Sequence, residues 1–148
     1  MKLPKYQLTS GEELLSYEFI SEGPKGLIRK RIQFTLINRD DVYNLAFGDK
    51  DTATNEMDDM VISNNGDSEN VLATVISALY AFCDKHPGAW VFAAGSTSAR
   101  TRLYRMGITK YYNEIQNDFE VYGQTEGEWE LFEKDKVYSA FLCCQKTL

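Results

Sequence analysis

The chain has 148 residues, of which 43% are hydrophobic and 13% aromatic, which is enough apolar material for one packed domain and argues against a disordered protein. Its formal charge of -6 and its pI of about 4.8 argue against a general nucleic-acid-binding protein or a membrane-surface protein. The length predicts a single globular domain over residues 1–148. Because neither a signal-peptide core nor a bilayer-spanning apolar run occurs, we expect this domain to be in the cytoplasm without membrane contact.

Three cysteines and one histidine limit the chemistry that the side chains can provide. Cys143 and Cys144 are adjacent, and Cys83 brings the number to three, with no Cys-x-x-Cys spacing. Adjacent cysteines rarely pair with each other, and metal sites use spaced ligands, so we expect reduced thiols and no bound metal. His86 lies at the end of a predicted helix, which favours a helix-end role and disfavours a Ser-His-Asp triad.

The first third of the chain predicts β-structure. A short edge segment is expected around residues 6–8, followed by strands over 14–21 and 27–37 that alternate apolar and polar residues. The two glycines and the proline of residues 22–26 are typical of a turn, so these two strands form a hairpin. A third strand is predicted over 42–47.

Residues 49–69 are acidic, with seven carboxylates and one lysine. Their composition is typical of a solvated loop, within which 57–62 can form a short strand. A connection this long in a compact domain also suits a functional loop, and both interpretations stay open. The adjacent Asp58 and Asp59 are weak candidates for metal ligands or general bases, since neighbouring acids are common in acidic loops.

A helix is predicted over 69–85, because apolar residues recur at spacings of three and four, and Asp67 or Ser68 can cap its start. The continuous apolar run 90–94 suits a central strand, and the order strand, helix, strand predicts a parallel crossover.

A second helix is predicted over 97–116, with Gly107 as a point where it can break. Strands over 119–122, 128–132 and 137–144 complete the order β-β-β-α-β-α-β-β(-β). The fold class is α/β (α+β): a mixed, mostly antiparallel sheet with two main helices.

The segment 95–105 is the best candidate for a site. An apolar strand, a small polar turn and a helix start leave backbone N–H groups available to an anion, and three arginines follow at once. Arg102 and Arg105 lie about 60° apart on the helix surface, whereas Arg100 points elsewhere. The predicted ligand-binding residues are Gly95, Ser96, Thr97, Arg100, Arg102 and Arg105, edged by Asn65 and Asp67. Alternatively, the turn only caps the helix and the arginines pair with the acidic loop 49–69.

Four segments resemble those of an uncharacterised family of short bacterial proteins, mainly from Bacteroidetes. The resemblance covers nearly the whole chain, implies no activity, and suggests that the four segments converge in space. They are Phe-Ile-Ser-Glu-Gly-Pro-Lys-Gly (19–26), Asn-Leu-Ala-Phe-Gly-Asp (44–49), Ser-Asn-Asn-Gly-Asp (63–67) and Gly-Ser-Thr-Ser-Ala-Arg-Thr-Arg-Leu-Tyr-Arg (95–105).

The element order and Leu-Tyr-Arg-Met-Gly-Ile (103–108) also resemble the GNAT acyl-CoA N-acyltransferases. That resemblance implies Tyr104 as general acid and acyl-CoA as cofactor. Two departures stand against it. Glycine follows Tyr104 by three residues instead of four, and residues 64–68 replace the pyrophosphate-binding loop with a sequence that contains an acid.

These observations predict a cytoplasmic ligand-binding or interaction domain with an anion or phosphate pocket at 95–105 and no cofactor. The alternative is a divergent acyl-CoA-dependent N-acyltransferase; a toxin-like or partner-binding role rests on small size alone. The expected partners are a small anionic ligand and, through the aromatic C-terminal strands, a second copy of the chain.

Overall fold

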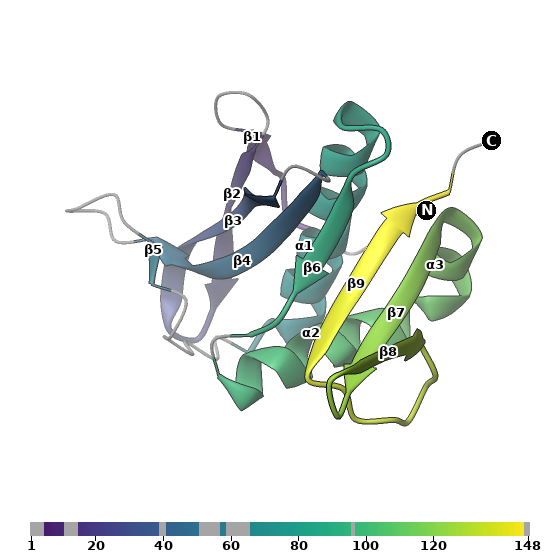
Figure 1. Ribbon diagram of the computed structural model, residues 1–148. Helices are drawn as coiled ribbons and strands as arrows, with labels where there is room; N and C mark the ends of the chain where they lie inside the picture. Colours follow the sequence, from purple (N-terminus) through teal and green to yellow (C-terminus); the bar gives the residue numbers. More distant parts are fainter. Residues whose placement is uncertain are drawn as a thin grey trace.

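The computed structural model of the protein describes residues 5–10, 15–38, 41–50, 57–58, 66–95 and 97–146. Within these residues, nine strands form one mixed, mostly antiparallel sheet with three helices beside it (Figure 1), which confirms the predicted α/β class. The strands are β1 (Thr9–Ser10), β2 (Ser16–Gly23), β3 (Gly26–Asn38), β4 (Val42–Lys50), β5 (Met57–Asp58), β6 (Trp90–Ala93), β7 (Phe119–Thr125), β8 (Glu128–Leu131) and β9 (Ala140–Gln145). The helices are α1 (Ser68–Lys85), α2 (Ser98–Lys110) and α3 (Tyr112–Asp118).

The N-terminal part of the sheet is an antiparallel meander in which β2, β3 and β4 pair in chain order. The alternation predicted from the sequence holds, because Phe19, Ile32 and Phe34 all point to one face and are almost completely buried. β4 contributes Phe47 to the same face. This aromatic face forms one half of the core.

The two halves of the sheet meet where β4 and β6 run parallel. Only the residues from Val42 to Asn44 pair with β6, and β4 then continues to Lys50 without that partner. Helix α1 forms the crossover between the two strands, as the sequence predicts. Beyond β6, strand β9 lies between β6 and β7, and β8 forms the outer edge.

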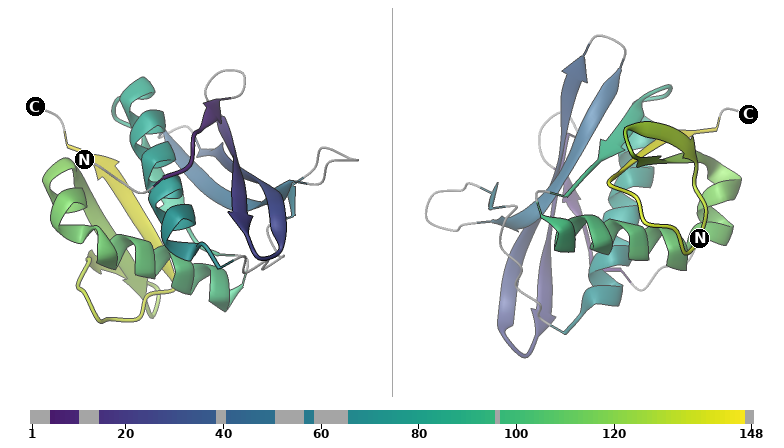
Figure 2. Two further views of the ribbon diagram at one scale, coloured as in Figure 1. Left: turned by 180° about the vertical axis from the view of Figure 1, so that it is seen from behind. Right: turned by 60° about the horizontal axis from the view of Figure 1, so that its bottom comes forward.

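The helices lie together on one face of the sheet (Figure 2). Helix α1 buries the predicted apolar stripe, and the ring of Phe82 stacks on Phe34 with 4.1 Å between centroids. His86 ends the helix, stacks on Phe82 at 4.4 Å, and places Nδ1 3.1 Å from the Phe82 carbonyl oxygen. In the described part of the chain, no helix is long and apolar enough to cross a membrane.

The predicted helix 97–116 is in fact two helices, α2 and α3, and the break is at Tyr111 instead of Gly107. Gly107 stays helical because α2 crosses α1 there. A Cβ built on Gly107 would lie 3.1 Å from Leu72 Cδ2, so the missing side chain permits this close crossing. Tyr111 leaves the helical region with φ -107° and ψ 17°.

Three strand boundaries also differ from the prediction. Residues 6–8 form no strand, because the Tyr6 N–H donates to Thr74 Oγ1 at 2.8 Å, and the edge strand β1 follows them. The last strand begins at Ala140 and not at residue 137, since the ring of Tyr138 covers Gly123. A Cβ built on Gly123 would lie 2.4 Å from Tyr138 Cδ1. Of the predicted strand 57–62, only β5 falls within the described residues.

Candidate functional site

The turn between β6 and α2 is closed by hydrogen bonds within the chain. The Gly95 N–H donates to Thr101 Oγ1 at 3.0 Å, and Thr97 Oγ1 accepts from the Arg100 N–H at 3.1 Å. A Cβ on Gly95 would lie 2.4 Å from the Thr101 nitrogen, so only glycine fits here. Ser96 lies outside the described residues. The described polar groups of the turn thus serve the start of α2, which is the capping alternative that the sequence left open.

The three arginines of α2 lie in three different environments. Arg100 is buried at 6% exposure, with Cζ 4.5 Å from the centroid of the Phe47 ring. Arg102 is exposed, and Arg105 is partly buried beside a surface groove. The arginines therefore do not form a single cationic patch.

The four segments that the family resemblance singled out do converge, as far as their described residues go. Ser21 Oγ donates to Asp67 at 2.5 Å, which joins the first segment to the third. The rings of Phe19 and Phe47 stack with 6.2 Å between their centroids, which joins the first segment to the second. The guanidinium of Arg100 lies over the Phe47 ring, which joins the second segment to the fourth. The suggested convergence is confirmed for these contacts.

Sequence reasoning missed a buried lysine in this region. Lys30 is 4% exposed, forms an ion pair with Asp49 on the neighbouring strand, and places Nζ 5.7 Å from the Phe47 centroid. The alternation of β3 was the available signal, because it puts Lys30 on the same face as Ile28 and Ile32. Two buried cations thus share one aromatic ring, which ties β3, β4 and α2 together.

Asp67 occupies the N-cap position of α1, but its carboxylate forms no cap, contrary to the prediction. The carboxylate instead accepts from the hydroxyls of Tyr6 at 2.6 Å and Ser21 at 2.5 Å. Burial, followed by the hydrogen bond to Asp67, raises the pKa of the Tyr6 hydroxyl. The first N–H groups of α1 therefore receive no acceptor from this side chain. Asn65 lies outside the described residues.

A surface groove of about 640 Å³ runs between the start of α1 and the second half of α2. Lys110 and Glu69 form an exposed ion pair across it at 2.9 Å. None of the ion pairs among the described residues includes Arg105. The residues lining the groove are Ser68, Glu69, Leu72, Arg105, Met106, Thr109, Lys110 and Asp135.

Tyr104 points to the other side of α2, where it is 7% exposed and lines an apolar cavity of about 70 Å³. The cavity lies between the sheet and the helices, with Leu45 and Val91 on its sheet side. Leu72 lines both this cavity and the surface groove.

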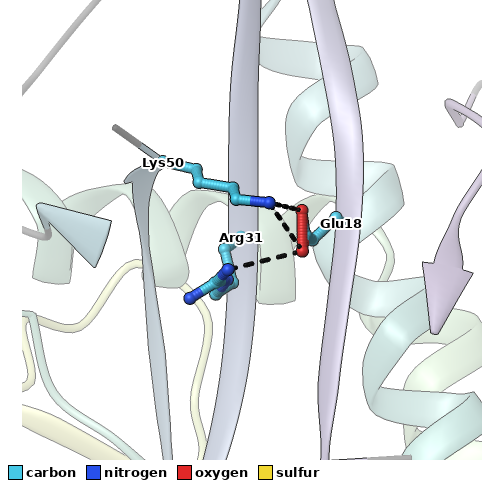
Figure 3. Close-up of polar contacts among 3 residues, drawn as sticks. All are labelled: Glu18, Arg31 and Lys50. Carbon is cyan, nitrogen blue, oxygen red and sulfur yellow. Dashed lines mark hydrogen bonds and ion pairs between the residues drawn. The ribbon is translucent and has the colours of Figure 1, made fainter. Parts of the chain in front are cut away.

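A second charged cluster joins the three strands of the meander (Figure 3). Glu18 accepts from Lys50 at 2.7 Å and from Arg31 at 3.5 Å. Burial pushes the pKa of Glu18 up, but the hydrogen bond and charge of Lys50, together with Arg31, outweigh burial and lower that pKa. Pairing of Glu18 with Arg31 in the ladder places the cluster on the face opposite Phe19, so it does not belong to the convergent segments.

The predicted pairing of the arginines with the acidic loop concerns residues that lie largely outside the described part of the chain. Among the described acids of this loop, Glu69 pairs with Lys110, and Asp49 pairs with Lys30. Both acids thus bind lysines.

Comparison with curated proteins found no match, and comparison with solved structures found none either. A family model described as a family of unknown function (DUF6934) matches residues 2–146. Because this match spans nearly the whole chain, the protein belongs to that family of unknown function.

Proposed function

We propose that this protein binds a small anionic ligand, such as a phosphate compound, in the groove between the start of α1 and the second half of α2. The observation that carries the proposal is Arg105, which lines the groove while none of the ion pairs among the described residues uses it. An arginine can hold a phosphate or carboxylate with two parallel hydrogen bonds.

The surroundings of Arg105 support this proposal. The groove includes Ser68 and Glu69 of the first turn of α1, where the Asp67 carboxylate is turned toward Tyr6 and Ser21. Unsatisfied N–H groups at a helix start favour an anion. Glu69 is held by Lys110, which offsets its charge. Under this proposal, Arg105 is the residue of the predicted site that binds the ligand, whereas Gly95, Thr97 and Arg100 support α2.

The second candidate is the divergent acyl-CoA-dependent transferase. The observation that favours it is the element order, with a parallel β4/β6 pair bridged by α1 and followed by α2, which agrees with the order on which the GNAT resemblance rests. Under this hypothesis the groove would receive the phosphates of CoA, and Tyr104 would act as general acid from the far side of α2.

Thermal-shift titration tests the proposal, with inorganic phosphate, ADP, CoA and acetyl-CoA added to the full chain. A ligand at a hundred times its Kd should raise stability by about 2.7 kcal/mol. We expect at least one phosphate compound to raise the melting temperature of the wild type. Arg105→Ala should weaken the affinity for that compound at least tenfold. Arg102→Ala, the matched control on the exposed side of α2, should leave the affinity unchanged.

The same titrations separate the two candidates. A shift with CoA and acetyl-CoA, accompanied by thiol release in the presence of an amine acceptor, would establish the transferase, and Tyr104→Phe should then lower the rate. If no phosphate compound shifts the melting temperature, or if both arginine variants behave alike, the anion groove is wrong.

A further inference from the structure

The apolar cavity lies directly behind the anion groove. It is lined by apolar and aromatic side chains of the three helices and the sheet, among them Val75, Ile76, Ala93 and Tyr104. Protein interiors are normally packed without voids of this size, and an apolar cavity stays dry unless an apolar group enters it. The groove in front of it is polar, with the cations Arg105 and Lys110 and the acids Glu69 and Asp135 on its wall.

Leu72 separates the two spaces. Its side chain is 5% exposed and belongs to the lining of both the groove and the cavity. Gly107 faces this partition from α2 and packs closely on Leu72, since a Cβ built on Gly107 would lie 3.1 Å from Leu72 Cδ2. A change of the Leu72 rotamer is the movement that would connect the groove with the cavity.

We propose that the ligand is an amphipathic anion, whose charged group binds Arg105 and whose short apolar group enters the cavity past Leu72. This inference rests on the proposed anion groove. A water-sized group needs about 10–15 Å³ of cavity volume, so a cavity of about 70 Å³ takes about five heavy atoms. The apolar group is accordingly a straight or branched chain of about four or five carbons.

A series of alkyl phosphates tests the inference, because the charged group stays constant while the chain grows. Isothermal titration calorimetry would compare methyl, butyl and octyl phosphate. Burial of a methylene is worth about 0.8 kcal/mol, or about fourfold in affinity, so butyl phosphate should bind at least tenfold more tightly than methyl phosphate. Octyl phosphate should bind no more tightly than butyl phosphate, since the cavity is then full.

Two variants test whether the alkyl chain of the ligand lies in the cavity. Gly107→Ala adds a Cβ 3.1 Å from Leu72 Cδ2, which restricts the movement of Leu72 at the cavity wall, while the added helix propensity supports folding. Ala93→Leu fills the cavity from the sheet side, away from the groove. Both should abolish the advantage of butyl over methyl phosphate and leave methyl phosphate binding intact. Ser98→Ala, an exposed substitution in α2, is the control and should preserve the full series.

The outcomes distinguish this inference from the anion groove itself. Equal affinity for methyl and butyl phosphate, or a chain-length advantage that survives in both cavity variants, overturns the inference and leaves the groove standing. Failure of every phosphate to bind overturns both. In wild type, butyl phosphate should also shift the NMR methyl signals of Leu72, Val75 and Ile76. Unchanged signals at these residues would show that the alkyl chain lies outside the cavity and would overturn the inference.

Discussion

Arg100 and Arg102 are two residues apart in α2, yet their side chains have opposite surroundings. Arg100 is buried over the Phe47 ring, whereas Arg102 is exposed to solvent. A desolvated cation–π contact is worth about 2 kcal/mol, and the buried methylenes of the side chain add to it.

We therefore expect Arg100→Ala to lower the free energy of unfolding by about 2–4 kcal/mol and Arg102→Ala to change it by less than about 0.5 kcal/mol. Urea denaturation of the two variants beside the wild type measures both values. Equal effects of the two substitutions would contradict the buried position of Arg100.

Cys83 makes stability depend on alkaline pH. Burial, and then the nearby Cys144 and Asp84, raise the pKa of the Cys83 thiol to about 12. In the unfolded chain the thiol ionises near pH 8.5, so the unfolded state gains charge first. The stabilisation from the neutral thiol is complete below that pH and is lost as the pH rises toward 12, by at most about 1.4 kcal/mol per pH unit.

The test compares wild type and Cys83→Ala by urea denaturation at pH 7.5, 9 and 10. The stability difference between them should shrink as the pH rises, because only the wild type carries the thiol. Val75→Ala removes a buried side chain that does not titrate, and its stability difference should stay constant. A difference for Cys83→Ala that is equally constant would show that its pKa is not raised.

At the scale of the element, the start of α2 depends on its cap. Thr97 Oγ1 accepts from the Arg100 N–H, and the neighbouring Ser98 is the first residue of the helix and is exposed. Loss of an N-cap hydroxyl typically costs about 1 kcal/mol.

Thr97→Ala should therefore lower the free energy of unfolding by about 1 kcal/mol, while Ser98→Ala should leave it nearly unchanged. Circular dichroism during thermal unfolding measures both. If Thr97→Ala left stability intact but abolished binding of phosphate compounds, the turn would be a ligand site and not a cap.

For the molecule as a whole, the short β4/β6 pairing raises the question of whether the two halves of the sheet unfold together. Helix α1 links them, since its Phe82 packs on Phe34 of β3 and its Ile76 lines the cavity with Val91 of β6. Because both halves lose core contacts when α1 leaves, we expect one cooperative transition.

Two probes measure this cooperativity. Fluorescence of Trp90 and Trp129 reports on the C-terminal half of the sheet, and amide exchange in β2 and β3 reports on the N-terminal half. Coincident urea midpoints are expected. Separate midpoints would mean that the chain consists of two folding units.

Much of the fold could be predicted because it depends on local patterns. The alternation of β3 and the spacing of apolar residues in α1 each identify a buried face from neighbouring residues alone. The break at Tyr111 could not be predicted, since Gly107 is the weaker helix residue in isolation and is kept helical by its contact with Leu72.

The candidate site depended more strongly on tertiary structure. The sequence identified the arginine-rich start of α2, but its spacing could not tell which arginine would meet Phe47 and which would line a groove. Asp67 shows the same limit, because the adjacent helix suggested its backbone N–H groups as donors to the carboxylate, whereas the donors are the hydroxyls of Tyr6 and Ser21.

The sequence by itself determined the main strands and helix α1, the mixed sheet and the segment that carries the cations, because periodicity and turn residues act over a few neighbouring positions. Only the tertiary structure decided that Arg100 and Lys30 are buried on one ring, that the Asp67 carboxylate binds Tyr6 and Ser21 and does not cap α1, and that Leu72 lies between a groove and a cavity. Each of these features joins residues far apart in the chain, and side-chain packing between elements is set by the crossing of α1 and α2 and by the register of the sheet.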